Sequence, residues 1–361
     1  MKKIILTGGG TAGHVTPNLA LLPGLQARGY EVRYIGTYNG IEKTLAGNAG
    51  IPYDGISSGK LRRYFDLKNF SDPFRVMKGY GEARTMLKKY RPDVVFSKGG
   101  FVAVPVVLAA HHLHIPVMIH ESDMTPGLAN KLCMPSAQKI CCNFPETLPY
   151  LPESKAVLTG SPIRAEILQG DRETGLAYCH FTPEKPVILV IGGSLGSVAV
   201  NTAVRNLLPQ LLIDYQVIHI CGKGHLEESL IGREGYIQFE YVDAPLKHLF
   251  AAADLIISRA GANSICEILA MRKPNILIPL SAQASRGDQI LNARSFEKQG
   301  FSTVLAEEEV NNETLLQAVI DTMQSKEERI RQMDQSPLKD AVSTILDLLD
   351  QLADNSGSKE G

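Results

Sequence analysis

Short apolar runs alternate along the chain with glycine-containing turns and with longer segments of helical spacing. The first run, Lys3–Leu6, precedes a glycine-rich turn at Gly8–Gly13, and apolar or small residues then recur at helical spacing over Pro17–Arg28. Gly29 follows, where a glycine ends a helix, and Glu31–Ile35 is a second apolar run. The pattern predicts a strand, a turn, a helix and a further strand.

The same order continues through the first half of the chain. Further strands are expected at Val94–Phe96, Val117–His120 and Lys139–Cys142, with helices at about Arg75–Tyr90 and Pro105–His112. Strands and helices that alternate at this length predict a parallel sheet covered by helices on both faces.

The pattern restarts at Pro186–Ile191, the strongest strand signal in the chain. Gly192–Gly196 follows as a second glycine turn, and a helix is expected from about Val198 to Leu212. Later strands are expected at Val217–Ile220, Ile237–Phe239, Leu255–Ile257, Asn275–Ile278 and Thr303–Leu305. The predicted fold class is therefore α/β, with two Rossmann-like parallel-sheet domains and a ligand in the deep cleft where they face each other.

The two halves define the expected domains. Residues 1–160 form the first and residues 161–339 the second. Beyond Glu327 the pattern predicts one more helix, at about 340–353, which packs back on the first domain. Residues 354–361 are polar and rich in Gly and Ser, so we expect a disordered tail.

Composition narrows the class of protein. Of 361 residues 44% are hydrophobic and 6% aromatic, which is typical of an α/β enzyme, and a net charge of −1 gives no general attraction to nucleic acid. The six cysteines form no C-x-x-C pair, so they are expected to be reduced thiols that bind no zinc. No apolar run reaches 18 residues, which leaves peripheral contact as the expected mode of membrane binding.

The first glycine turn matches G-x-G-x-x-G after a strand. A dinucleotide site also requires an acidic residue at the end of the second strand, but that strand ends at Thr37 and Glu42 comes later, so NAD is not favoured. His14 stands at the following helix start, where the helix dipole lowers the pKa of an imidazole and makes a neutral base available. The alternative is a capping histidine without chemistry.

A longer block, Ser258–Asn292, carries the most specific chemistry. A strand ends at a glycine turn, the turn opens a helix that holds Glu267, and a second strand leads to a polar run with Gln289 and Asn292. A helix start directs free N–H groups at an anion, and a carboxylate accepts hydrogen bonds from ribose hydroxyls. The block predicts a site for a substituted nucleoside diphosphate, unless Glu267 only pairs with Arg272.

Two further side chains, Ser194 and Arg164, are candidates for this nucleotide site, and the sequence predicts no metal in it. Ser194 is the one polar side chain in the second glycine turn, which lacks the lysine of a Walker loop. Arg164 follows Gly160–Ile163 at the expected domain junction, where a guanidinium can clamp a pyrophosphate. No pattern of carboxylates or histidines predicts a metal, and neither a metal nor a cofactor is expected.

The stretch Lys60–Arg91 is basic, with ten Lys or Arg against three Asp or Glu and aromatic residues between them. This mixture favours contact with an anionic membrane surface. A solvated helix with buried aromatic residues is the alternative, and nucleic acid is a weaker one.

Several motifs occur along the chain in a fixed order: Gly9–Pro17, Pro92–Val95, Gly99–Phe101, His120–Glu121, Gly127–Lys131, Gly160–Arg164, Gly192–Ser194 and Ser258–Asn292. In this order and spacing they are highly specific, and over about Lys2–Leu349 the chain resembles the MurG family, UDP-N-acetylglucosamine:lipid I N-acetylglucosaminyltransferases of bacterial peptidoglycan synthesis. The resemblance implies the GT-B fold, with the donor mainly on the second domain.

The resemblance also implies roles for single residues. Glu267 would hold the ribose, Val242 would lie beside the uracil, and Arg164 would approach from the junction. The diphosphate would face Ser194 and the turn of Gly261, Ala262, Asn263 and Ser264, while Asp288 and Gln289 would reach the sugar and Asn292 belongs to the same block. Thr11, Ala12 and Gly13 would line the acceptor side, with His14 and Glu121 as candidates for the base.

Family members act on lipid I and UDP-N-acetylglucosamine, so the resemblance implies a peripheral protein on the cytoplasmic face of the cell membrane, with cell-wall synthesis proteins as possible partners. Two departures from the family pattern matter. Ala12 replaces a glycine, which requires a negative φ, and Ser122–Asp123 and Asp288 replace family amides. The alternatives are a glycosyltransferase with another lipid acceptor, a non-catalytic nucleotide-sugar-binding or membrane scaffold protein, and an NAD-dependent oxidoreductase.

Overall fold

The computed structural model describes residues 1–59, 72–193, 196–282 and 287–357. The chain divides into two compact units, one of Met1–Arg164 with Asp340–Gly361 and one of Ala165–Lys339. Each unit is built on one sheet, and every strand pair in both sheets is parallel. The prediction of an α/β fold with two parallel sheets is confirmed.

The first sheet has seven strands in the order β3-β2-β1-β4-β5-β6-β7. They are β1 (Lys2–Thr7), β2 (Tyr30–Thr37), β3 (Tyr53–Ile56), β4 (Val94–Ser97), β5 (Val117–Glu121), β6 (Lys139–Cys142) and β7 (Ala156–Leu158). The order reverses between β1 and β4, so the turns after these two strands lie side by side where ligands of such sheets bind.

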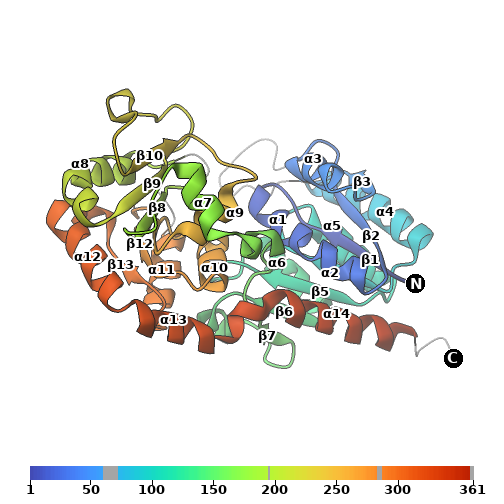
Figure 1. Ribbon diagram of the computed structural model, residues 1–361. Helices are drawn as coiled ribbons and strands as arrows, with labels where there is room; N and C mark the ends of the chain where they lie inside the picture. The colour runs from blue at the N-terminus through green and yellow to red at the C-terminus, as the bar shows by residue number, and fades with distance from the viewer. Residues whose placement is uncertain (60–71, 194–195, 283–286, 358–361) are drawn as a thin grey trace. The chain divides into compact units, whose positions relative to one another are not determined.

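Helices cover both faces of this sheet (Figure 1). They are α1 (Thr16–Ala20), α2 (Leu22–Ala27), α3 (Ile41–Asn48), α4 (Asp72–Tyr90), α5 (Ala103–His112), α6 (Leu128–Cys133) and α14 (Ala341–Gly357). Alternate strand residues face opposite layers: Ile5 packs with α4 and α5, whereas Ile4 and Leu6 pack with α2 and α14. Strands buried on both faces read as continuous apolar runs, which is why the sequence identified them.

Two details of the first unit correct the sequence-based expectation. One helix was expected over Pro17–Arg28, but α1 and α2 are separated at Leu21, because Pro23 has no N–H to continue the helical ladder. A disordered tail was expected from Asp354, but α14 continues to Gly357, and Asp354 pairs with Lys2 at 2.8 Å. Asp350 of the same helix pairs with both Lys2 and Arg28, so charge contacts dock the end of the chain.

The second sheet has six strands in the order β10-β9-β8-β11-β12-β13. They are β8 (Val187–Ile191), β9 (Gln216–Ile220), β10 (Tyr236–Phe239), β11 (Leu255–Ser258), β12 (Asn275–Leu277) and β13 (Thr303–Val304). The order reverses between β8 and β11, so the turns that follow these strands also meet at a switch point.

The helices of the second unit are α7 (Arg172–Cys179), α8 (Val198–Asp214), α9 (Leu246–Ala252), α10 (Ala262–Ala270), α11 (Asp288–Lys298), α12 (Asn312–Gln324) and α13 (Lys326–Gln335). The expectation of a single helix after Glu327 was wrong, because α13 precedes α14. Only Met333 of α13 is buried, so this helix lacks the apolar periodicity that reveals a helix in sequence. Among the described residues no helix is both long and apolar enough to cross a membrane.

Candidate active site

The glycine-rich turn after β1 is held by a buried carboxylate, Glu42, at the start of α3. Glu42 is 0% exposed, and its carboxylate accepts hydrogen bonds from the Thr37 N–H (2.9 Å), the Thr37 hydroxyl (2.6 Å) and the Gly10 N–H (3.3 Å). Gly9, Gly36 and Gly40 surround it, and a Cβ on any of them would collide with its side chain. The glycines therefore make room for a carboxylate that fixes the turn.

Replacing Glu42 by glutamine is expected to destabilise the protein at neutral pH by about 1–3 kcal/mol, because one of the donors loses a charged acceptor. Burial by itself would raise the pKa of Glu42, but the hydrogen bonds from Thr37 and Gly10 outweigh it and lower that pKa. A depressed folded-state pKa gives stability that is present above the unfolded value of 4.5 and is lost as the pH falls through the folded value.

Urea unfolding of the wild type and Glu42→Gln at pH 7 and at decreasing pH below 4.5 tests this. The difference between the two free energies of unfolding should shrink as the pH falls. Glu153→Gln, which changes an exposed carboxylate of the same unit, should match the wild type throughout. A gap that stays constant with pH would contradict the assignment.

His14 lies at the end of the same turn, with its imidazole half-buried. Its Nδ1 is 3.1 Å from the Gly9 carbonyl oxygen and 3.2 Å from the Thr11 hydroxyl. A carbonyl only accepts, so Nδ1 carries the proton and Nε2 of the neutral ring is the basic nitrogen. Burial, and then the charge of Lys98, lowers the pKa of His14. The lowered pKa favours the neutral form of the ring, with Nδ1 as the protonated nitrogen.

The turn before His14 includes Ala12, for which the sequence analysis requires a negative φ. Thr11 and Ala12 are exposed and Gly13 is half-buried. Ala12 begins a short 3-10 helix, Ala12–His14, and does not have a positive φ. The methyl group at position 12 therefore sits in an ordinary backbone conformation.

Glu121, the last residue of β5, is 3% exposed and organises the loop that follows it. Its two carboxylate oxygens accept hydrogen bonds from the Asp123 N–H (2.9 Å), the Gly127 N–H (3.0 Å) and the Asn130 amide (2.8 Å). Burial raises the pKa of Glu121 although these donors oppose the effect. Its carboxylate thus ties the end of β5 to the start of α6.

In the second unit the turn after β11 opens α10. Gly261 is the N-cap of α10 and has no side chain that could cap this end, and Ala262, Asn263 and Ser264 form the first turn. Helix starts leave backbone N–H groups without helical partners, and these groups attract anions. Glu267 follows in the second turn and is partly exposed among the buried residues Cys266 and Ile268. Both groups of the predicted donor site therefore belong to one helix.

Arg259 joins the parts of this switch point, a role that the sequence did not reveal. It is 8% exposed, and its guanidinium donates to the Ser197 hydroxyl (2.6 Å), to Glu307 (2.5 Å) and to the carbonyls of Ile278 (3.0 Å) and Pro279 (3.2 Å). Ser197 is in turn the N-cap of α8. One buried cation thus links the starts of α8 and α10 to the end of β12.

The polar run before and within α11 also connects to these turns. Asn292 is 4% exposed and its amide donates to the Ala260 carbonyl at 3.1 Å. The Gln289 side chain accepts from the Leu280 N–H at 3.0 Å, and Asp288 is exposed at the start of α11. Asn292 therefore holds the turn of Gly261, while Gln289 holds the segment after β12.

The remaining predicted residues are more scattered. Val242 is buried in the segment after β10, and Arg164 is exposed at the end of the first unit. Ser194 lies outside the described residues, as do positions 60–71 of the basic stretch.

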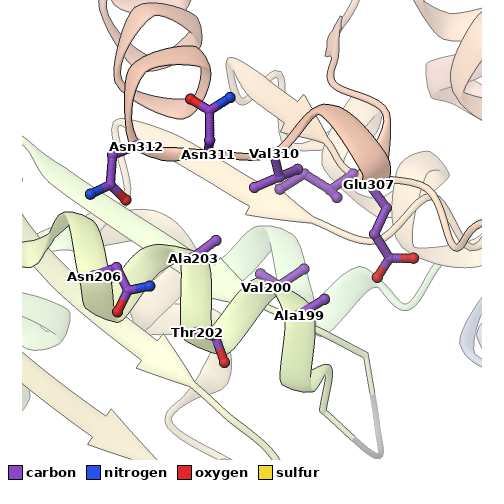
Figure 2. Close-up of a pocket in the computed structure, with 10 residues that line it drawn as sticks. Ala199, Val200, Thr202, Ala203, Asn206, Glu307, Val310, Asn311 and Asn312 are labelled. Atoms are coloured by element: carbon purple, nitrogen blue, oxygen red, sulfur yellow. The ribbon is translucent and has the colours of Figure 1, made fainter.

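A cavity of about 320 Å³ lies elsewhere in the second unit, between α8 and the start of α12 (Figure 2). Ala199, Thr202 and Asn206 line it from α8, and Val310 and Asn311 line it from the opposite side. None of the predicted donor residues lines it, although Glu307 at its edge binds Arg259. Within the described ranges no cluster of three or more His, Cys, Asp or Glu could hold a metal ion.

The chain matches two family models. Residues 4–142 match the glycosyltransferase family 28 N-terminal domain, and residues 187–349 match the glycosyltransferase family 28 C-terminal domain. The two matches fall on the two sheets described above, and each contains one of the two switch points.

Similar proteins were found among characterised sequences and solved structures. A protein of Lachnoclostridium phytofermentans is 64% identical over 98% of this chain and 99% of its own length, and one of Lachnospira eligens is 63% identical over 97% and 99%. Both are named UDP-N-acetylglucosamine–N-acetylmuramyl-(pentapeptide) pyrophosphoryl-undecaprenol N-acetylglucosamine transferase. The crystal structure of Acinetobacter baumannii MurG has a TM-score of 0.78 at 28% identity, covering 97% of this chain and 100% of that one.

Proposed function

The chain belongs to the MurG family, and from this premise we propose how its two switch points divide the work of glycosyl transfer. The enzyme transfers N-acetylglucosamine from UDP-N-acetylglucosamine to the C4 hydroxyl of the muramyl sugar in lipid I, with inversion, and so makes lipid II for peptidoglycan. The observation that carries the division is the position of Glu267 in the second turn of α10, just beyond the glycine turn that begins this helix.

The second unit binds the donor. Glu267 accepts hydrogen bonds from the ribose hydroxyls, and the diphosphate lies at the N–H groups of Ala262–Ser264, where the helix dipole favours negative charge. Val242 lies beside the uracil, and Asp288 and Gln289 reach the sugar. Arg259 and Asn292 keep the turn in place through the hydrogen bonds described above.

The first unit activates the acceptor. Nε2 of His14 accepts the proton of the C4 hydroxyl while the hydroxyl oxygen forms a bond to the anomeric carbon. The bond from that carbon to the phosphate oxygen breaks, and UDP leaves with the electron pair. N–H groups at the start of α10 stabilise the negative charge that develops on UDP. Attack opposite the leaving group gives the β-1,4 linkage.

Glu121 is assigned a positioning role in this scheme. Both of its oxygens already accept hydrogen bonds within the loop Asp123–Asn130, so taking up the acceptor proton would disrupt the start of α6. His14 has the basic Nε2 of a fixed tautomer instead. Of the two candidates that the sequence left open, the geometry favours His14.

Peripheral binding to the cytoplasmic face of the membrane completes the proposal, because the acceptor is attached to undecaprenol. In the described part of the basic stretch, Phe74 is 75% and Met77 is 71% exposed, and Arg75 and Lys78 stand beside them. Exposed apolar side chains beside cations fit an anionic bilayer surface.

Replacing Phe74 and Met77 by serine together is expected to weaken binding to anionic vesicles by about 100-fold or more, since each buried apolar side chain contributes roughly 1.5–3 kcal/mol. Co-sedimentation with vesicles of phosphatidylglycerol measures this. Tyr150→Ser, which removes another exposed aromatic residue of the first unit, is the matched control. Unchanged sedimentation of the double variant would exclude this contact.

The proposed reaction is tested by incubating the protein with UDP-N-acetylglucosamine and a short-chain analogue of lipid I. Release of UDP in equal amount to a product that has gained one N-acetylhexosamine is the expected result. A parallel reaction with diacylglycerol should give no glycolipid. Transfer to diacylglycerol alone, or no transfer to either lipid, would overturn the assignment.

A further inference from the structure

Lys98, the residue after β4, is a lysine that the fold buries almost completely. It is 1% exposed, and its Nζ lies 2.6 Å from Nδ1 of His120, 2.7 Å from the Ser122 hydroxyl and 3.4 Å from the Ser161 hydroxyl. A buried ammonium is costly unless its three N–H groups find acceptors. These contacts come from the end of β5 and from the segment after β7, so the cation links the ends of β4 and β5 to that segment.

The tautomer of His120 shows where the positive charge resides. Its Nε2 lies 2.8 Å from the Gly160 carbonyl oxygen, so Nε2 carries the ring proton. Nδ1 is then left as the acceptor for Lys98. Burial, followed by the charge of Lys98, holds the pKa of His120 well below its usual value. The cluster therefore consists of a charged lysine, a neutral histidine and two hydroxyl groups.

The segment that begins with Lys98 also touches the turn that holds His14. β1 and β4 are neighbours, with Thr7 paired to Ser97, and the Lys98 N–H donates to the Thr7 carbonyl at 3.0 Å. Gly100 packs so tightly on the Gly9 carbonyl that a Cβ there would collide with it. The same carbonyl receives Nδ1–H of His14. The Lys98–Gly100 segment and the His14 ring thus contact one peptide group.

The charged groups around His14 come from three elements. Lys98 after β4 disfavours a second positive charge, whereas Asp123 after β5 and Glu42 on α3 favour one. The pKa of His14 is lowered by burial first and by Lys98 second, and these effects outweigh the hydrogen bond to the Gly9 carbonyl and the two carboxylates, which raise it. The cation, rather than either acid, therefore adds to burial in setting the charge of the ring.

We propose that Lys98 is a positioning residue that keeps His14 neutral and correctly held, so that Nε2 is ready to accept a proton at cytoplasmic pH. Lys98 acts through its charge, and Gly100 of the same segment packs on the Gly9 peptide that holds the ring. Its burial keeps Lys98 from touching a substrate. The inference rests on the proposed role of His14 as base. It also predicts the charge state of His14 independently of turnover.

Titration of the full-length protein labelled with ¹⁵N-histidine tests the inference, with His14→Asn used to assign the His14 resonances. The wild-type ring should be the Nδ1–H tautomer with a pKa below 6.5. Lys98→Met, which keeps the length of the side chain without its charge, should raise that pKa by about 0.3 to 1 unit, as expected for a partly screened unit charge. Lys273→Met removes a largely buried lysine of the second unit and should leave it unchanged.

The pH dependence of kcat/KM should change together with the pKa of His14. Loss of the Lys98 charge should shift the acidic limb of the kcat/KM profile to higher pH by the same amount, while the KM for UDP-N-acetylglucosamine stays constant. A His14 pKa that is the same in folded Lys98→Met and in the wild type would overturn the inference. A wild-type His14 that titrates at or above 6.5 would overturn it without any Lys98 variant, should that variant not fold.

The activity of His14→Ala tests the proposed base separately from the role of Lys98. If His14→Ala keeps its full kcat, then His14 is not the base, and the titration still decides whether Lys98 sets its charge.

Discussion

His14→Ala is expected to lower kcat by about 10²–10⁴-fold, the usual contribution of a positioned general base. Binding of UDP-N-acetylglucosamine should be unchanged, because the residues proposed to hold its ribose and diphosphate, Glu267 and Ala262–Ser264, belong to the second unit. The reason lies in the turn after β1. The Gly9 carbonyl fixes the His14 tautomer, so that Nε2 accepts a proton, and alanine offers no replacement.

Single-turnover rates with a lipid I analogue, together with calorimetric titration of UDP-N-acetylglucosamine, measure the two effects separately. Glu121→Gln is the informative comparison, since it removes the other candidate base with little change in shape. It should lose stability, because the loop Asp123–Asn130 depends on its oxygens, and keep more activity than His14→Ala. A Glu121→Gln protein that is fully folded but less active than His14→Ala would reverse the two roles.

Glu267→Ala is expected to weaken the binding of UDP-N-acetylglucosamine by about 10- to 100-fold, since hydrogen bonds to a charged group contribute roughly 1.5–3 kcal/mol. The carboxylate lies on the second turn of α10, one turn from the N–H groups proposed to hold the diphosphate. Glu267→Gln keeps one acceptor oxygen, and we expect an intermediate effect.

The measurement is the dissociation constant for UDP-N-acetylglucosamine and for UDP. Both should change by the same factor, because the ribose belongs to both ligands. Glu297→Ala, which removes an exposed carboxylate of α11, is the matched control and should bind like the wild type. If folded Glu267→Ala binds UDP with wild-type affinity, the ribose is held elsewhere.

The sequence predicted the strands that are buried on both faces and missed two edge strands of the first sheet. Val187–Ile191 and Val94–Ser97 are continuous apolar runs, because helices cover both sides. Tyr53–Ile56 and Ala156–Leu158 are short strands at the two edges of the first sheet, and their partly exposed side chains give no clear pattern. The edge strands of the second sheet, Tyr236–Phe239 and Thr303–Val304, are also partly exposed but were predicted.

The candidate site was proposed from sequence where its residues are consecutive. The turn that leads to His14 and the turn that leads to Glu267 each combine a glycine run with a helix start, and both are read directly from the chain. Lys98 and Arg259 were not assigned roles, because their partners are distant in sequence. Arg259, for example, meets Ser197 across 62 positions. No local pattern reports such contacts.

A crystal structure of the protein soaked with UDP-N-acetylglucosamine would show directly whether Glu267 and the start of α10 hold the donor. We expect the ribose hydroxyls to lie within hydrogen-bonding distance of the Glu267 carboxylate, with the diphosphate at the N–H groups of Ala262–Ser264. A nucleotide bound away from α10, or one whose ribose makes no contact with Glu267, would contradict it.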